Sequence, residues 1–216
     1  MTLIRRDFFA RPSVQVAPEL LGCVLEHQTP AGLVAVELTE VEAYAGASDP
    51  ASHAYRGKTA RNAVMFGPPG HAHVYFTYGM HFCVNLVCAR NGSASAVLLR
   101  AGRVIEGEEL ARARRTRGST VISFRDLARG PARLCLALDI DRSQDGVDVC
   151  LPDSPLRMRW PDASTAARSD QRKAASGPRV GISKAAEVPW RFWWAGDPTV
   201  SPYRAAVPRH PKLVTP

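Results

Sequence analysis

The chain has 216 residues, 45% of them hydrophobic, enough to bury one core and more economical as one domain than as two. We expect no membrane span, and residues 1–7 lack the apolar run of a signal peptide. The five cysteines are scattered and odd in number, which favours reduced thiols in a cytosolic protein over a disulfide framework. The net charge of +8 favours DNA or RNA as partner, although an arginine-rich proteome gives the same balance.

The first half of the chain has the pattern of strands joined by turns. In chain order it predicts a short helix, two strands, a long loop, a hairpin and another strand, at residues 18–22, 23–27, 34–44, 45–70, 74–87 and 96–101. The hairpin has Gly79 at its tip, between two apolar runs. The loop is rich in polar and charged residues, and loops of that length inside a compact domain are usually functional or disordered.

The second half is more helical. Acids early and arginines late predict a helix at residues 106–115, and Pro131 suits the first position of a second helix that ends near Leu138. Further strands are predicted at residues 147–151, 179–182 and 190–194, and a mobile, weakly hydrophobic loop at 162–177. We expect one mixed α/β (α+β) domain over residues 1–216, with a curved, mostly antiparallel sheet, flanking helices and peripheral tails at 1–16 and 203–216.

Two acidic residues stand out in the strand at residues 34–44. Side chains in a strand alternate, so Glu40, Glu42 and Tyr44 are predicted to continue on the face of Val34 and its apolar neighbours. A carboxylate buried there is costly unless it is paired, hydrogen-bonded or placed at the wall of a cleft, where it can activate water. Two alternatives remain open at this point: a salt bridge to an arginine, or a bulge that turns the two glutamates out to solvent.

Two other groups of side chains suggest specific sites. Aromatic and polar residues near Glu42 in sequence or on adjoining strands could form a stacking pocket: Tyr44, His53, Tyr75, Asn85 and Arg100. His71, His73, His81 and Cys83 come in pairs with two-residue spacing, which raises the alternative of a zinc site. No recognisable ligand set completes the zinc pattern, so we expect no metal and no cofactor.

At these residues the sequence resembles the alkyladenine (3-methyladenine) DNA glycosylase family. The similarity runs from about Pro18 to Asp197 with order and spacing preserved. The motifs that carry it are Val41-Glu42-Ala43-Tyr44, Ser52-His53, Arg61-Asn62-Ala63-Val64-Met65-Phe66, Val74-Tyr75-Phe76-Thr77-Tyr78-Gly79-Met80, Asn85, Val97-Leu98-Leu99-Arg100-Ala101, Gly130-Pro131-Ala132-Arg133-Leu134-Cys135 and Gly177-Pro178-Arg179-Val180-Gly181-Ile182. Ala60 departs from the proline that many relatives have before Arg-Asn.

The resemblance implies a monofunctional enzyme that flips alkylated or deaminated purines, such as 3-methyladenine or hypoxanthine, out of duplex DNA and hydrolyses the glycosidic bond. It implies a role for each matching residue: Glu42 as the general base, Arg100 as the group that holds the water or orients the carboxylate, Tyr44, His53 and Tyr75 around the flipped base, Met65 beside them, Asn85 against the exocyclic amine of guanine, Tyr78 as the wedge in the duplex, and Arg61, Arg133 and Arg179 at the phosphates. We expect a cytoplasmic, bacterial-type monomer, associated with the nucleoid while it works.

Two rival functions belong to other classes. A non-catalytic nucleic-acid-binding protein with a base-stacking pocket explains the charge and the tyrosines, but not a carboxylate in a cleft that faces phosphates. A zinc-dependent hydrolase uses the histidine pairs. Within the glycosylases, a lyase needs an amine nucleophile, and the only lysine in the long loop is Lys58.

Overall fold

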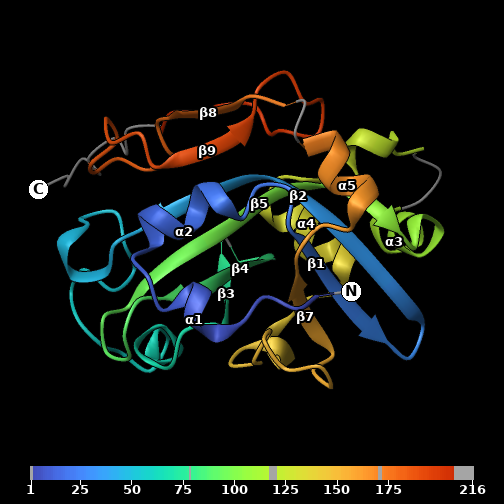
Figure 1. Cartoon of the computed structure of the whole chain (residues 1–216). Helices are drawn as coiled ribbons and strands as arrows, with labels where there is room; N and C mark the ends of the chain where they lie inside the picture. Colours follow the sequence, from blue (N-terminus) through green and yellow to red (C-terminus); the bar gives the residue numbers. More distant parts are fainter. Residues whose placement is uncertain (1, 78, 117–120, 170–171, 207–216) are drawn as a thin grey trace, which may run out of the picture.

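The structure, a computed structural model, describes residues 2–77, 79–116, 121–169 and 172–206. Within these residues nine antiparallel strands form one sheet (Figure 1). They are β1 Val24–Thr29, β2 Gly32–Tyr44, β3 Ala72–Thr77, β4 His81–Cys88, β5 Ser95–Glu106, β6 Ala128–Arg129, β7 Leu156–Arg159, β8 Ala174–Gly177 and β9 Arg191–Trp194. The main path runs β3-β4-β5-β2-β1-β7, while β6 pairs with β5, and β9 joins β2 to β8. The fold is therefore the mixed α/β arrangement expected, with an antiparallel sheet.

Short helices flank this sheet: α1 Arg6–Phe9, α2 Ser13–Glu19, α3 Glu108–Arg115, α4 Pro131–Leu138 and α5 Ala163–Ser169, with 3₁₀ turns at Gly46–Ser48, Ala63–Phe66, Phe124–Asp126 and Arg142–Gln144. Helix α4 has Pro131 in its first turn and ends at Asp139, whose φ of 60° stops the helix. Its buried Leu134 and Leu138 pack on β4 and β5. In the described part of the chain no helix combines the length and the apolarity that a bilayer span requires.

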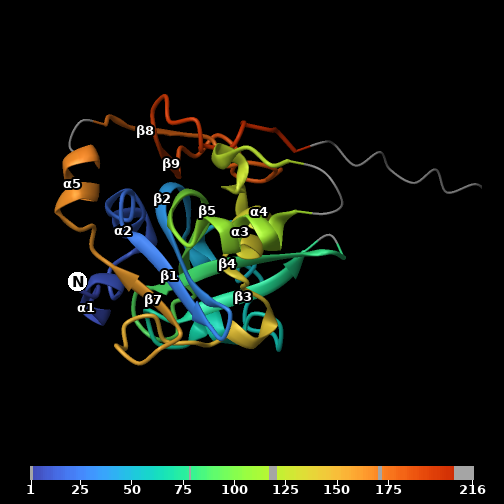
Figure 2. The same ribbon diagram turned by 90° about the vertical axis from the view of Figure 1, so that its right-hand side faces the viewer.

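Several predicted elements are confirmed. The helix predicted at residues 131–138 is α4, and the one at 106–115 is α3, two residues shorter at its start. The hairpin is the pair β3–β4, which extends away from the body of the sheet (Figure 2). Each of these elements has a strong local signal, either a cap with helical periodicity or alternation around a glycine.

Other predicted elements are wrong. The helix expected at residues 18–22 begins earlier, at Ser13, and contains Pro18 in its last turn. The stretch 147–151 makes a single bridge to His71 instead of a strand, and 179–182 is irregular because Gly181 has a φ of +71°. Apolar alternation in a short segment does not distinguish a strand from a turn that places two side chains in the core.

The described residues of the expected N-terminal tail and of the expected mobile loop take part in the core and in the secondary structure. Residues 1–16 were expected to be peripheral, but Ile4, Phe9 and Val16 are fully buried in the main core. The described part of residues 162–177 contains α5 and β8, and β8 is held by pairing with β9. Long-range pairing supplies the stability that the composition of this segment does not indicate.

The predicted face of Glu40 and Glu42 is also wrong, because the strand contains an irregularity. The register between β2 and β5 shifts on both sides of Glu40. Before the shift the core residues of β2 are Val34, Val36 and Leu38, and after it they are Val41 and Ala43. A bulge of this kind moves every following side chain to the other face. Glu40 and Glu42 therefore leave the apolar core, yet both stay fully buried, under β9 and the segments around it.

Candidate active site

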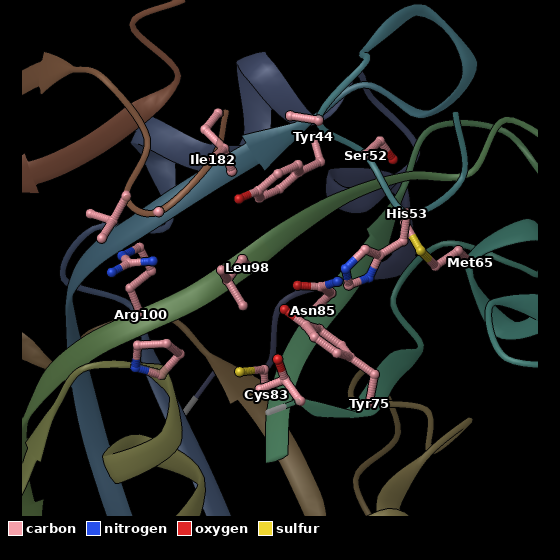
Figure 3. Close-up of a pocket in the computed structure, with 15 residues that line it drawn as sticks. Tyr44, Ser52, His53, Met65, Tyr75, Cys83, Asn85, Leu98, Arg100 and Ile182 are labelled. Atoms are coloured by element: carbon pink, nitrogen blue, oxygen red, sulfur yellow. The ribbon is translucent and has the colours of Figure 1, made fainter. Parts of the chain in front are cut away.

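A cavity of about 300 Å³ lies between strands β2 to β5, two loops and the start of α4 (Figure 3). This volume is at the lower end of the range for small-molecule sites, about 300–1,000 Å³. Six of the seven residues expected for catalysis and base binding line it: Arg100, Tyr44, His53, Met65, Tyr75 and Asn85. The remaining walls come from Ala51, Ser52, Thr77, Cys83, Leu98, Pro131, Val180, Gly181 and Ile182. Loop and strand residues far apart in the sequence thus meet as the resemblance implies.

Glu42, the seventh residue, lies directly behind this wall. Its side chain is fully buried. The Tyr44 hydroxyl donates a hydrogen bond of 2.8 Å to Oε2, and the Val180 N–H donates one of 2.7 Å to Oε1. Nη1 of Arg100 lies 3.3 Å from Oε1. Because Tyr44, Val180 and Arg100 all line the cavity, a single layer of donors separates the carboxylate from it.

Glu42 and its neighbours determine the protonation states of Arg100 and Tyr44. Burial opposes the charge of Arg100, but the carboxylates of Glu42 and Glu40 outweigh it and raise the pKa of the guanidinium. Burial also raises the pKa of Tyr44, and the Glu42 charge adds to the increase. Tyr44 is therefore a neutral hydrogen-bond donor to Glu42 at all ordinary pH values, and Arg100 is a permanent cation.

Aromatic rings form the far side of the cavity, opposite Tyr44 (Figure 3). His53 meets Tyr75 edge-on, with ring centroids 4.6 Å apart, and His73 stacks behind Tyr75 at 5.7 Å. Burial lowers the pKa of His53, so the imidazole is neutral near pH 7. A neutral imidazole beside electron-rich tyrosine rings can accept a flat cation without repulsion between like charges.

Asn85 and Met65 also line the cavity. Asn85 is 5% exposed, and among the described residues its Oδ1 has no hydrogen-bond partner. An unpartnered buried amide oxygen is costly to the fold, so this position is set by the site rather than by stability. Met65 is 1% exposed and packs with Ala54, Ala94 and Ala96 in a small cluster separate from the main core. The unpartnered amide oxygen of Asn85 thus lies beside the apolar surface of Met65.

Two contributions to the site were missed in the sequence. Asn62 organises the long loop: its Oδ1 accepts from the Thr59 N–H and hydroxyl, and its Nδ2 donates to the carbonyls of His53 and Gly57. A polar residue in a loop gives no signal of that role beyond the motif it belongs to. The Val180 N–H was missed because residues 179–182 were assigned to a strand, where the N–H groups pair with a neighbouring strand.

The residues expected to contact phosphates differ in their exposure to solvent. Arg61 is exposed beside His53, and Arg133 is exposed on α4, 3.4 Å from Asp126. Arg179, in contrast, is buried: it pairs with Asp49 through Nη2 at 2.9 Å and donates to the Ala43 carbonyl. The expected phosphate contact of Arg179 does not fit this position. The expected wedge, Tyr78, lies outside the described residues.

The residues of the zinc alternative have other partners. Nδ1 of His71 lies 3.3 Å from Arg6, and Nδ1 of His73 lies 3.2 Å from Asp145. Cys83 lies opposite Tyr75 in the pairing of β3 with β4. Among the residues that the structure describes, no group of three or more potential ligands is arranged to hold a metal ion. The donor set for a zinc hydrolase is therefore not assembled there.

His73 gives a prediction for stability against pH. Burial lowers its pKa, and the Asp145 carboxylate offsets this only in part. The unfolded chain takes up a proton as the pH falls through about 6.5, whereas the folded protein does so only at lower pH. His73 therefore destabilises the fold on acidification, by up to about 1.4 kcal/mol per pH unit for one proton. In thermal melts between pH 7.5 and 5, we expect His73→Gln to have the flatter curve. A curve parallel to that of the wild type would contradict this assignment.

Known proteins are similar to this chain over almost its full length. The family profile described as methylpurine-DNA glycosylase (MPG) matches residues 7–198. A protein of Streptomyces avermitilis is 57% identical over 210 residues, which cover 96% of this chain and 95% of the relative. Proteins of Leifsonia xyli (50% identical; 95% and 93% covered) and Methanocella arvoryzae (43%; 93% and 96%) are also similar. All three carry the name "Putative 3-methyladenine DNA glycosylase". This chain belongs to the methylpurine-DNA glycosylase family.

Proposed function

We propose that the protein is a monofunctional 3-methyladenine DNA glycosylase of base-excision repair, in which Glu42 activates the attacking water. The observation that carries the proposal is the carboxylate of Glu42, held by an N–H, a hydroxyl and a guanidinium one layer behind an aromatic cavity. A purine inside the duplex cannot reach such a group, so the damaged nucleotide must be flipped into the cavity. Stacking on an aromatic ring contributes about 1–3 kcal/mol, comparable to the cost of unstacking.

The chemistry follows from the contacts of Glu42. A carboxylate oxygen can accept more than one hydrogen bond, so Oε2 can accept a second beside the one from Tyr44. We place the water there: its oxygen attacks C1′ of the sugar while Glu42 takes its proton. The C1′–N bond breaks, and its electron pair leaves with the base, which departs neutral if alkylation had made it cationic. Tyr44, His53 and Tyr75 hold the base, and Asn85 disfavours guanine by a clash with its exocyclic amine.

Duplexes with one lesion each test this proposal. With a chelator present, the protein should release free base from 3-methyladenine, hypoxanthine, 7-methylguanine or ethenoadenine duplexes, and the strand should stay intact until alkali is added. No covalent adduct should be trapped by borohydride, because no lysine is among the described residues that line the cavity. Binding without base release would favour the non-catalytic alternative, and a borohydride adduct would point first at Lys58.

Arg133 gives a prediction about backbone binding. It is exposed on α4, whose first residue lines the cavity. A side chain that binds one phosphate releases about one counterion. Arg133→Ala should therefore weaken binding to lesion and undamaged duplexes alike and flatten the slope of log K against log salt by about one unit. Equilibrium titrations at several salt concentrations measure this slope.

The matched control is Arg5→Ala. Arg5 is also an exposed arginine, but it follows Ile4, whose N–H bonds to β7 at the opposite edge of the sheet from β3. Its replacement should leave the salt slope unchanged. If Arg133→Ala weakens binding to lesion DNA only, the side chain acts in the base pocket rather than at a phosphate.

A further inference from the structure

A second glutamate, which the proposed chemistry does not use, lies next to Glu42 in a fully buried network. Oε1 of Glu40 accepts hydrogen bonds from Nε of Arg100 and Nε of Arg191, both of 2.7 Å, and from the Ser201 hydroxyl at 2.9 Å. Oε2 accepts from the Ser201 N–H at 2.7 Å. The Ser201 carbonyl in turn accepts from Nη2 of Arg191 at 2.7 Å. Glu40 thus connects β2, β5, β9 and the segment after β9 at one point.

The network fixes the direction of Arg100. Its Nε is bonded to Glu40, and its Nη2 donates to the Ser201 hydroxyl at 3.3 Å. A guanidinium is planar and rigid, so anchoring two nitrogens fixes the position of the third. That third nitrogen, Nη1, is the one that faces Glu42. Without Glu40, the shortest contact of Arg100 disappears and the guanidinium is free to turn toward Glu42.

The network also balances charge. Two carboxylates, Glu40 and Glu42, are buried with two guanidiniums, Arg100 and Arg191. Burial opposes the charge of Glu40, but Arg100, Arg191 and the Ser201 hydroxyl outweigh it, so the pKa of Glu40 lies below its usual value. If Glu40 were uncharged, both cations would act on Glu42 alone. The electrostatic potential at this side of the cavity would then be more positive, which disfavours proton uptake there.

We propose that Glu40 is a positioning residue for the glycosylase reaction: with Ser201 it holds Arg100 so that Nη1 faces Glu42 and the cavity, and it takes up the charge of Arg191. The inference rests on the proposed role of Glu42. The titratable and charged groups that face Glu42 from the elements around it are Tyr44 and Glu40 on β2, Arg100 on β5, Arg191 on β9, Arg179 above the Tyr44 ring, and Tyr75 and Cys83 on β3 and β4. Glu40 is the one of these that competes with Glu42 for Arg100.

The test compares Glu40→Gln with Glu40→Asp by their single-turnover excision rates across a range of pH. The enzyme is present in saturating excess over the lesion duplex. Glutamine keeps the shape and removes the charge. We expect the rate to fall by about tenfold to a hundredfold, and the acid limb of the pH profile to move to lower pH by about one unit. Aspartate keeps the charge but is one methylene shorter, so the rate should fall while the acid limb stays in place. Affinity for the lesion duplex should be unchanged in both.

Glu37→Gln is the matched control. Glu37 is another fully buried carboxylate of β2, paired with Arg172 at 2.8 Å, and it does not contact Arg100. It should lose thermal stability without a change in the pH profile. If Glu40→Gln behaves like this control, with a lower melting temperature and the wild-type acid limb, Glu40 is merely structural and the proposal is overturned.

Two further variants separate the possible failures. Ser201→Ala removes one hydroxyl from Glu40 and Arg100 and should lower the rate severalfold, so it tests the network even if Glu40→Gln does not fold. A wild-type rate in Ser201→Ala, with Glu40→Gln unfolded, would overturn the proposal. Glu42→Gln in the same assay reports on the proposed function: if it remains active, both proposals fail, whereas an inactive Glu42→Gln beside an unshifted Glu40→Gln overturns the positioning role alone.

Discussion

Glu42→Gln should abolish base release while binding to lesion DNA persists. Glutamine has the same shape and keeps its amide oxygen available to the Val180 N–H. Its amide nitrogen can face the Tyr44 hydroxyl, which then acts as acceptor instead of donor. The pocket is thus preserved, but the side chain cannot accept a proton from water. Loss of a general base costs about 10²–10⁴-fold in rate.

Single-turnover excision and equilibrium binding to the same lesion duplex measure the two effects separately. Glu37→Gln serves again as the control, because it neutralises a buried carboxylate of the same strand away from the cavity. It should retain the wild-type rate at temperatures where it is folded. An excision rate of Glu42→Gln within tenfold of the wild type would rule out Glu42 as the base. Loss of lesion binding would show that the carboxylate mainly supports the pocket.

The sequence predicts the elements of the fold that local signals define. Helix α4 is predicted close to its observed ends because a proline begins it and periodic leucines follow. Strand β7 was not predicted, because its partner β1 lies far away in the sequence and pairing of that kind leaves no local pattern. Burial of Ile4 and Phe9 was missed for the same reason, since chain ends are peripheral unless tertiary contacts hold them.

The candidate site could be predicted in its residues but not in its geometry. Six residues meet at the cavity as the resemblance implies. From the sequence, a bulge at Glu40 is expected to expose the glutamates, yet the observed bulge buries them on the other face of β2. Two glutamates in one strand do not reveal from the sequence which of them pairs with two arginines and which lies next to the cavity. In the structure Glu40 pairs with Arg100 and Arg191, and Glu42 lies next to the cavity. That division depends on β9 and Ser201, which come more than 150 residues later in the chain.

Arg179 shows where the structure departs from a role that the resemblance implies. The resemblance implies a phosphate contact for it, but both Arg179 and Asp49 are fully buried and pair through both terminal nitrogens of the guanidinium. The guanidinium also stacks over the Tyr44 ring, 4.6 Å from its centroid, and donates to the Ala43 carbonyl at 3.0 Å. It therefore ties the start of the long loop to the end of β2, directly behind the residue that contacts Glu42.

Arg179→Ala should be the most destabilising of the substitutions considered. It leaves Asp49 as a buried charge without its partner, and breaking a buried pair in this way costs about 3–5 kcal/mol. For a chain of this size each kcal/mol lowers the melting temperature by roughly 2–4 °C, so a fall of about 10 °C is expected. Thermal denaturation at neutral pH measures it.

A second substitution identifies the cause of that loss. Arg179→Ala combined with Asp49→Asn removes the unpaired charge, so the double variant should recover part of the lost stability although it lacks both charged partners. Arg179→Lys should fall between wild type and Arg179→Ala, because lysine keeps the charge but cannot bond to both oxygens of Asp49 or stack flat on Tyr44. A wild-type melting temperature for Arg179→Ala, together with a flatter salt dependence of DNA binding, would instead indicate that Arg179 contacts a DNA phosphate.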